Sequence, residues 1–238
     1  MDIQLSCVIS LCLTLAAWRL HAVTVSGALV GMSMAVAFSF APTPHLFGLF
    51  VLFVIVGSAV SQLGKADKVR RGIAQSLGGR RSGWHAVANG GPSLLFLMIG
   101  IYLLPAHLDF CLVAAAASLT AMLSDTVAGE VGVWCGGQPR MILTMRPAKP
   151  GDDGAVTVLG TLSGLIAAGL GAWVVGIGMP KPLQGGMIVA SAAIFGNLAD
   201  SVLGQVVEPR LGRNGGFIVN AAASILGGLA AIVLLQMW

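Results

Sequence analysis

The chain has 238 residues, of which 56% are hydrophobic and only 9% are charged, and its mean hydropathy is +0.90. A soluble domain carries about a quarter charged residues, so this composition excludes a soluble globular protein and predicts an integral membrane protein. The net charge of +4 comes from basic residues in a few loops and not from a basic surface interleaved with aromatic residues, which excludes nucleic-acid binding. The length suits one integral membrane domain over residues 1–238.

Eight apolar runs approach the roughly 20 residues that a membrane span needs. They cover about residues 3–17, 22–40, 46–63, 86–104, 110–134, 154–179, 183–207 and 217–238. Because the runs are continuous and do not alternate, they predict an all-α, polytopic transmembrane helical bundle of about eight spans. The first run lacks the basic leader and the cleavage site of a signal peptide, so we interpret it as a retained helix.

Small residues four positions apart predict close helix packing at two places. The first is an edge formed by Gly27 and Gly31 in the second run, and the other is a stripe of Gly160, Gly164 and Ala168 in the sixth.

The basic residues predict the orientation of the bundle. Almost every Lys and Arg lies at 19–21 or in the loops at 65–85, 135–153 and 208–215, whereas the remaining loops are short and nearly uncharged. The positive-inside rule places these basic loops in the cytoplasm, with both termini on the non-cytoplasmic side. We expect a bacterial inner membrane protein whose active site faces the cytoplasm.

Three carboxylates lie inside the apolar runs: Asp125 and Glu130 in the fifth, and Asp200 in the seventh. Such a charge costs several kcal/mol on insertion scales, so it is usually paired, bound to a metal or exposed to water. The two runs contain no basic residue of their own. With Asn89 and Asn220, these side chains fall in the predicted cytoplasmic halves of four helices. A water-filled polar chamber open to the cytoplasm is the simplest arrangement that accommodates them.

This set of residues favours phosphoryl transfer. Carboxylate and amide oxygens suit Mg²⁺, and nearby Lys and Arg can neutralise phosphates. Metal and positioned cations are what phosphoryl transfer mainly needs, so we predict a Mg²⁺-dependent enzyme acting on a lipid phosphate or lipid alcohol. Asp125 and Glu130 are about 140° apart on an ideal helix, which leaves open whether both reach one metal. Interhelical hydrogen bonding by Asn89 and Asn220 stays open as an alternative role.

Five blocks of the sequence resemble those of the integral membrane family that includes the chloroplast phytyl-phosphate kinase of vitamin E synthesis. They are GRRSGWHAVANGG at 79–91, SDTVAGEVG at 124–132, GAVTVLGT at 154–161, GNLADSVLG at 196–204, and VN at 219–220 with Ser224. The resemblance covers nearly the whole chain in order. The chain departs from the family pattern at Val127, Gly129, Asn197 and Glu208.

The resemblance implies a kinase that uses CTP to convert an isoprenyl monophosphate, of phytyl or geranylgeranyl type, into the diphosphate. The family is also similar to the CTP-dependent polyprenol and dolichol kinases. We expect Asp125 and Asp200 to position Mg²⁺, with Glu130 as a third acid of the catalytic and metal site. We expect the nucleotide and the substrate phosphate to be bound by Asn89, Asn220, Lys65, Arg80, Arg81 and Ser201.

Two other functions remain open at this point. A cytidylyltransferase would make a CDP-lipid from the same reactants and release pyrophosphate. An ion- or proton-coupled transporter could use the buried acids, although such proteins often show inverted repeats and place their sites at the midplane. The state of association, including a homo-oligomer, also stays open.

Overall fold

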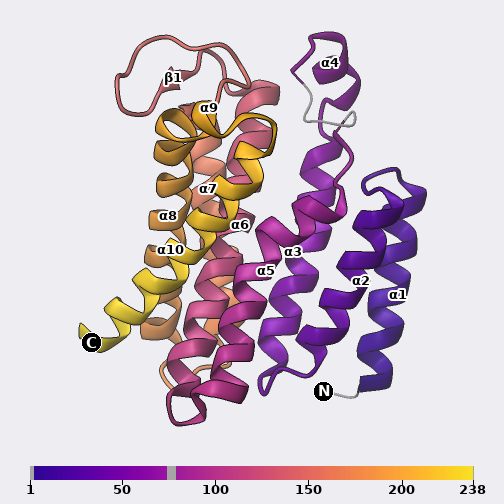
Figure 1. The fold of residues 1–238 in the computed structure, drawn as a ribbon, viewed down its shortest axis with the longest axis vertical. Coiled ribbons are helices and arrows are strands. Elements are labelled where there is room, and N and C mark those ends of the chain that lie inside the picture. The colour runs from indigo at the N-terminus through magenta and orange to yellow at the C-terminus, as the bar shows by residue number, and fades with distance from the viewer. Residues whose placement is uncertain (1–2, 74–78, 238) are drawn as a thin grey trace.

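The computed structural model describes residues 3–73 and 79–237, without the side chain of Arg213. The described chain is almost entirely helical, and its apolar helices lie side by side along one direction (Figure 1). They are α1 (Ile3–Arg19), α2 (Val25–Ser39), α3 (Pro44–Gln62), α5 (Gly83–Met98), α6 (Leu108–Cys135), α7 (Val158–Gly176), α8 (Pro182–Val206) and α10 (Gly215–Met237). A π-helical turn, η2 (Ile99–Leu103), continues α5. The prediction of an all-α membrane bundle is confirmed.

The helices differ in length. Among the described residues, six helices are long and apolar enough to cross a membrane: α3, α5 with η2, α6 with the turn before it, α7, α8 and α10. Helices α1 and α2 are shorter apolar helices of 17 and 15 residues. At 1.5 Å per residue the short pair spans only about 25 and 22 Å, less than the roughly 30 Å of a hydrocarbon core. The predicted eight spans are therefore six helices of full length and a shorter pair.

Helix α6 forms the axis of the bundle and contacts α3, α5, α7, α8 and α10. Every residue from Val113 to Ser124 is buried, including the alanines at 114–117. Because lipid tails are as apolar as leucine, membrane helices associate through close contact between small residues. The alanines of α6 therefore allow neighbours to approach it from all sides.

The predicted glycine stripe on α7 packs against α6, as expected. A Cβ on Gly160 would lie 2.6 Å from the carbonyl oxygen of Ala128, and one on Gly164 would lie 3.0 Å from the Ala128 Cβ. Ala168, the third member of the stripe, is fully buried. These contacts confirm that α6 and α7 pack almost backbone to backbone.

The predicted edge at Gly27 and Gly31 is wrong. A Cβ on Gly27 would clash with the carbonyl of Arg81, which belongs to a loop and not to a neighbouring helix. A Cβ on Gly31 would meet no described atom within 4 Å. These glycines therefore accommodate a loop and line an open space.

The polar segments gather at one end of the bundle, away from both termini (Figure 1). They include α4 (Lys65–Arg70), α9 (Glu208–Leu211), the 3-10 turn η4 (Gly212–Asn214) and a hairpin of β1 (Arg140–Met141) and β2 (Ala155–Val156). The hairpin is antiparallel and pairs Arg140 with Val156. Another 3-10 turn, η3 (Pro105–His107), precedes α6. The sequence predicted neither α4 nor the hairpin, whose short strands lack a recognisable period.

Two helix starts differ from the predicted ones because side chains cap them elsewhere. Helix α7 begins four residues later than expected, where the Thr157 hydroxyl accepts a hydrogen bond from the Gly160 N–H at 3.0 Å. Helix α5 begins three residues earlier, where the Ser82 N–H donates to Nδ1 of His85 at 3.1 Å. Asn89 consequently lies within α5 and not at its start.

The close packing predicts opposite responses to the same substitution at two helical glycines. A Cβ on Gly196 would lie 2.7 Å from the Cβ of Ala121, whereas one on Gly169 would meet no described atom within 4 Å. We expect Gly196→Ala to lower the free energy of unfolding by about 1–3 kcal/mol through overpacking, and Gly169→Ala to leave it unchanged or slightly raised. Thermal unfolding of both variants in the same detergent measures this, and equal effects would contradict the packing.

Candidate functional site

A cavity of about 920 Å³ lies beneath the polar loops, between α5, α6, α7, α8 and α10. Seven of the nine residues predicted for the site line it: Arg81, Asn89, Asp125, Glu130, Asp200, Ser201 and Asn220. The first and the last of these residues, Arg81 and Asn220, are more than 100 positions apart in the chain. The polar chamber expected from the sequence is therefore present, and it is large enough to hold small molecules.

The centre of the cavity is a pair of carboxyl groups. Asp125 on α6 and Asp200 on α8 lie within hydrogen-bonding reach of each other, and both are partly buried. Two carboxylates in contact repel, so they need a proton or a cation between them. Their oxygens form a donor set that suits Mg²⁺, which commonly uses one or two carboxylates and completes its shell with water and substrate phosphates.

Two asparagines extend this pair toward α5 and α10. The Asn220 amide lies 3.2 Å from Oδ1 of Asp200, 2.9 Å from the carbonyl oxygen of Gly216, and 2.9 Å from the Asn89 side chain. Because the carboxylate and the carbonyl can only accept, the amide nitrogen of Asn220 is the atom that faces them and donates. The interhelical hydrogen bonding considered from the sequence therefore occurs, and it orients Asp200.

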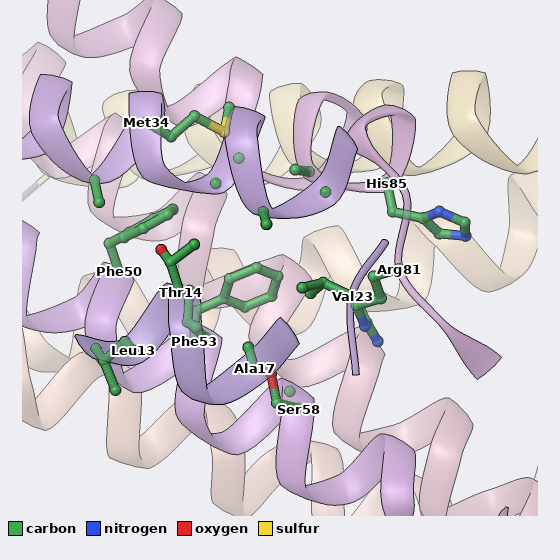
Figure 2. Close-up of a pocket in the computed structure, with 18 of the residues that line it drawn as sticks. Leu13, Thr14, Ala17, Val23, Met34, Phe50, Phe53, Ser58, Arg81 and His85 are labelled. Carbon is green, nitrogen blue, oxygen red and sulfur yellow. The ribbon is translucent and has the colours of Figure 1, made fainter. Parts of the chain in front are cut away.

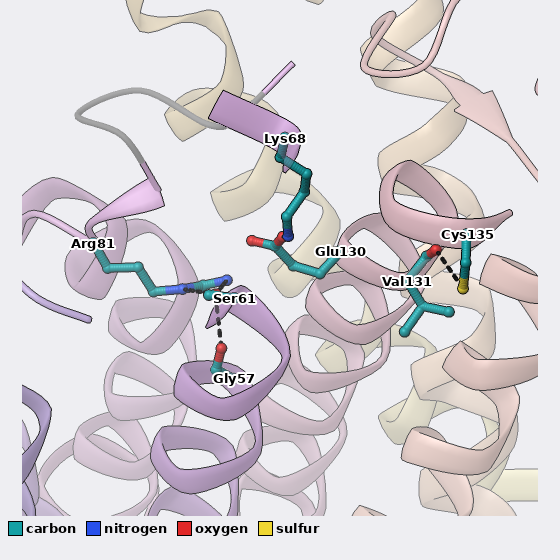
Figure 3. Close-up of polar contacts among 7 residues, drawn as sticks. All are labelled: Gly57, Ser61, Lys68, Arg81, Glu130, Val131 and Cys135. Carbon is teal, nitrogen blue, oxygen red and sulfur yellow. Dashed lines mark hydrogen bonds and ion pairs between the residues drawn. The ribbon is translucent and has the colours of Figure 1, made fainter. Parts of the chain in front are cut away.

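Glu130 does not join the carboxyl pair. Its carboxylate forms an ion pair of 2.5 Å with Nζ of Lys68 on α4, and the two residues are only 5% and 3% exposed (Figure 3). Within residues 3–73 and 79–237, no group of three His, Cys, Asp or Glu side chains is arranged to hold a metal ion. Among the described residues the expected grouping of three acids is therefore not formed, and Glu130 is paired instead with a lysine from another segment.

Arg81 is the predicted cation that the structure brings to the cavity. Its Nε and Nη2 donate to the Ser61 hydroxyl at 3.4 Å (Figure 3). Its Nη1 donates to the Thr126 hydroxyl at 3.5 Å. Burial lowers the pKa of Arg81, while the charges of Glu130 and Asp125 act in the opposite direction. The guanidinium therefore lines the same cavity as Glu130 and Asp125 and is within electrostatic reach of both carboxylates.

The other two predicted cations serve a different purpose. Lys65 Nζ donates to the carbonyl oxygen of His21, and Arg80 Nη2 donates to that of Val23, each at 3.2 Å. Neither residue is among the described residues that line the cavity. Lys65 fastens the turn between α1 and α2 to the start of α4, and Arg80 fastens the same turn to the loop before α5. Their membership of the basic run therefore did not indicate that they line the cavity.

Several lining residues were missed from the sequence. Asn197 donates to the Ser124 hydroxyl at 2.7 Å, and its position three residues before Asp200 could have indicated a shared helix face. Glu208 enters from the first residue of the short helix α9 and Asp153 from the turn before β2, and segments this short have no periodic signal. Burial, with the charges of Asp153 and Asp125, raises the pKa of Glu208 to about 7.

A smaller, mostly apolar cavity of about 90 Å³ lies between α1, α2 and α3 (Figure 2). It shares Arg81 and His85 with the larger cavity. His85 is held at this boundary because its Nδ1 accepts from the Ser82 N–H and its ring packs edge-on against Phe217. The two cavities are therefore adjacent, with Arg81 at their junction.

The buried ion pair predicts a strong dependence of stability on both partners. We expect Lys68→Met or Glu130→Gln alone to lower the free energy of unfolding by about 3–5 kcal/mol, because each leaves a buried charge without its partner. Combining Lys68→Met with Glu130→Gln should cost less than the sum of the two single losses, because the double variant leaves no buried charge without its partner. Denaturant unfolding of the single and double variants measures this coupling.

The exposed pair on α4 provides a matched control. Asp67 accepts from Arg70 at 3.0 Å, with side chains 43% and 78% exposed, so Asp67→Asn should leave the free energy of unfolding nearly unchanged. Additive losses from Lys68 and Glu130 would show that the buried pair is not coupled.

Glu208 predicts a change of stability with pH in the absence of divalent cations. A carboxyl whose pKa rises from 4.5 to about 7 on folding binds more protons in the folded state, so the free energy of unfolding falls as pH rises between these values. Glu208→Gln removes this contribution. We expect the variant and the native protein to have similar unfolding temperatures at pH 4.5 and the variant to be more stable at pH 8. A difference that stays constant with pH would refute this origin.

The comparisons with known proteins identify the family. The family described as integral membrane protein DUF92 matches residues 8–234. An uncharacterised membrane protein of Methanocaldococcus jannaschii is 32% identical over 190 residues, which cover 78% of this chain and 74% of that protein. A Synechocystis membrane protein is 34% identical over 184 residues, covering 76% and 70%. The chloroplast protein VTE6 of Arabidopsis thaliana is 25% identical over 198 residues, covering 80% and 58%. No solved structure matches significantly. Since the family match spans nearly the whole chain, the protein belongs to the DUF92 family of integral membrane proteins.

Proposed function

We propose that this protein is a membrane-embedded kinase that transfers the terminal phosphoryl group of CTP to an isoprenyl monophosphate and so makes the diphosphate. The observation that carries the proposal is the contact between Asp125 and Asp200 in a polar cavity that also contains Arg81. The five blocks shared with the phytyl-phosphate kinase family support the choice of substrates. The relationship to VTE6 supports an enzyme, and the choice of CTP and of a prenyl phosphate rests on the resemblance alone.

The acceptor explains why a metal site and a cation are sufficient. A phosphate monoester is largely a dianion at neutral pH, so its oxygen can attack without a general base. The reaction forms a bond between that oxygen and the terminal phosphorus of CTP and breaks the bond from this phosphorus to CDP. A divalent cation held by the carboxyl pair supplies charge neutralisation on the transferring group.

The residues of the chain then have separate tasks. Asp125 and Asp200 would hold the cation, and Asn220 keeps Asp200 oriented through its amide nitrogen. Arg81 lines the same cavity as the carboxyl pair and would bind the substrate phosphate, which a guanidinium can hold with two parallel hydrogen bonds. Glu130 acts indirectly, because it is paired with Lys68 and helps to hold α4 against α6.

The proposal predicts activity that depends on both carboxylates. With CTP, Mg²⁺ and geranylgeranyl or phytyl phosphate, we expect CDP and the prenyl diphosphate as products, and chelation of the metal should abolish them. Asp125→Asn and Asp200→Asn should each lower kcat by about 100-fold or more, as expected when charge stabilisation in the transition state is lost. Asp109→Asn, at the exposed first turn of α6, is the matched control and should keep full activity.

The same assay separates the proposal from its two rivals. Pyrophosphate with a CDP-lipid would identify a cytidylyltransferase. Flux of ions or protons in proteoliposomes without nucleotide, together with no product from any prenyl phosphate, would identify a transporter. Full activity of Asp125→Asn and Asp200→Asn would remove the carboxyl pair from the mechanism.

A further inference from the structure

The smaller cavity is an apolar groove that runs along the bundle. It is lined by α1, α2, α3 and the beginning of α5, together with Arg81 and Ser82 just before α5 (Figure 2). Leu13, Met34, Phe50 and Phe53 supply its apolar side chains. On α2 its lining extends from residue 27 to residue 35, which corresponds to about 12 Å along the helix axis. The groove is thus long, narrow and parallel to the helices.

The two ends of the groove differ in chemistry. Figure 2 shows Arg81 and His85 at one end, whereas Leu13 and Phe50 lie toward the other. Arg81 also lines the polar cavity that contains the carboxyl pair. A molecule with an anionic head and an apolar tail matches a groove that is basic at one end and apolar along its length. Its head would lie at Arg81 and its tail between the helices.

Small residues keep the groove open. Gly31 lines it, and a Cβ at this position would meet no described atom within 4 Å. Ala28, Ala35 and Gly57 also line it, so several of its lining positions carry small side chains or none. In a bilayer such a space is occupied by hydrocarbon, because a dry void loses the dispersion contacts of its lining.

We propose that this groove binds the isoprenoid tail of the monophosphate substrate, with the substrate phosphate at Arg81 facing the carboxyl pair. The inference rests on the proposed function for the identity of the head group, and it adds where the tail lies. The short helices α1 and α2 then form the lipid-binding part of the molecule, whereas α5 to α10 carry the chemistry.

Labelling tests the proposal on the native protein without requiring turnover. The full chain in nanodiscs is irradiated with a geranylgeranyl monophosphate that carries a diazirine at the end of its tail, and labelled peptides are identified by mass spectrometry. We expect labels on the segments 10–17, 31–35 and 50–54, and competition by unlabelled geranylgeranyl phosphate but not by phosphatidic acid. Labels confined to α7, α8 or α10, or equal competition by phosphatidic acid, would overturn the proposal.

Filling the groove with a larger side chain provides a second test, which measures KM for a long and a short prenyl phosphate. Gly31→Leu should raise KM for geranylgeranyl phosphate about tenfold, the effect of excluding roughly two methylene groups from an apolar site, and should leave KM for dimethylallyl phosphate unchanged. Gly169→Leu is the control, because this helical glycine on α7 is also open but lies outside the groove. An equal change for both substrates, or for both variants, would contradict the assignment.

The two experiments distinguish the failure of this inference from that of the proposed function. If no diphosphate forms but the groove is labelled and the label is competed by prenyl phosphate, the tail site stands and the reaction is wrong. If diphosphate forms and the label lies elsewhere, the reaction stands and the groove is wrong.

Discussion

The structure depends on the need to keep two carboxyl groups together inside an apolar helical bundle. Asp125 and Asp200 face each other from α6 and α8, and neither helix carries a basic residue that could neutralise them. A buried pair of this kind is tolerated only where a proton, a cation or water can reach it. The cavity of about 920 Å³ provides this access, and the polar loops, Arg81 and the asparagines surround it.

Small residues make this arrangement compatible with a tightly packed bundle. Alanines on α6 and glycines on α7 bring these two backbones together, so α6 holds Asp125 on a rigid support. The buried ion pair of Lys68 and Glu130 then links α4 to the end of α6. Close packing thus fixes the position of α6 at the site, and the buried ion pair fixes the position of α4 relative to α6.

The sequence predicted the membrane helices and most of the lining of the site because both have local signals. Long apolar runs are visible without knowing their neighbours, and a carboxylate or an amide within such a run needs a functional or structural explanation. Lys65 and Arg80 show the limit of this reasoning. They occupy the same basic run as Arg81, but they bind backbone carbonyls of the turn before α2, and a position in a charge cluster does not say where each side chain points.

By itself the sequence determined the class of fold, the order of the apolar helices and the presence of costly polar groups at similar depth. Hydropathy and charge act residue by residue, so they can be read along the chain. Only the tertiary structure decided which polar groups meet: Asp125 with Asp200, Asn89 with Asn220, and Glu130 with Lys68. It also decided that Gly31 borders an open groove and not a helix contact. These pairings depend on how each helix is rotated about its axis and on which helix packs beside it. Neither property can be predicted from the residues of one segment alone.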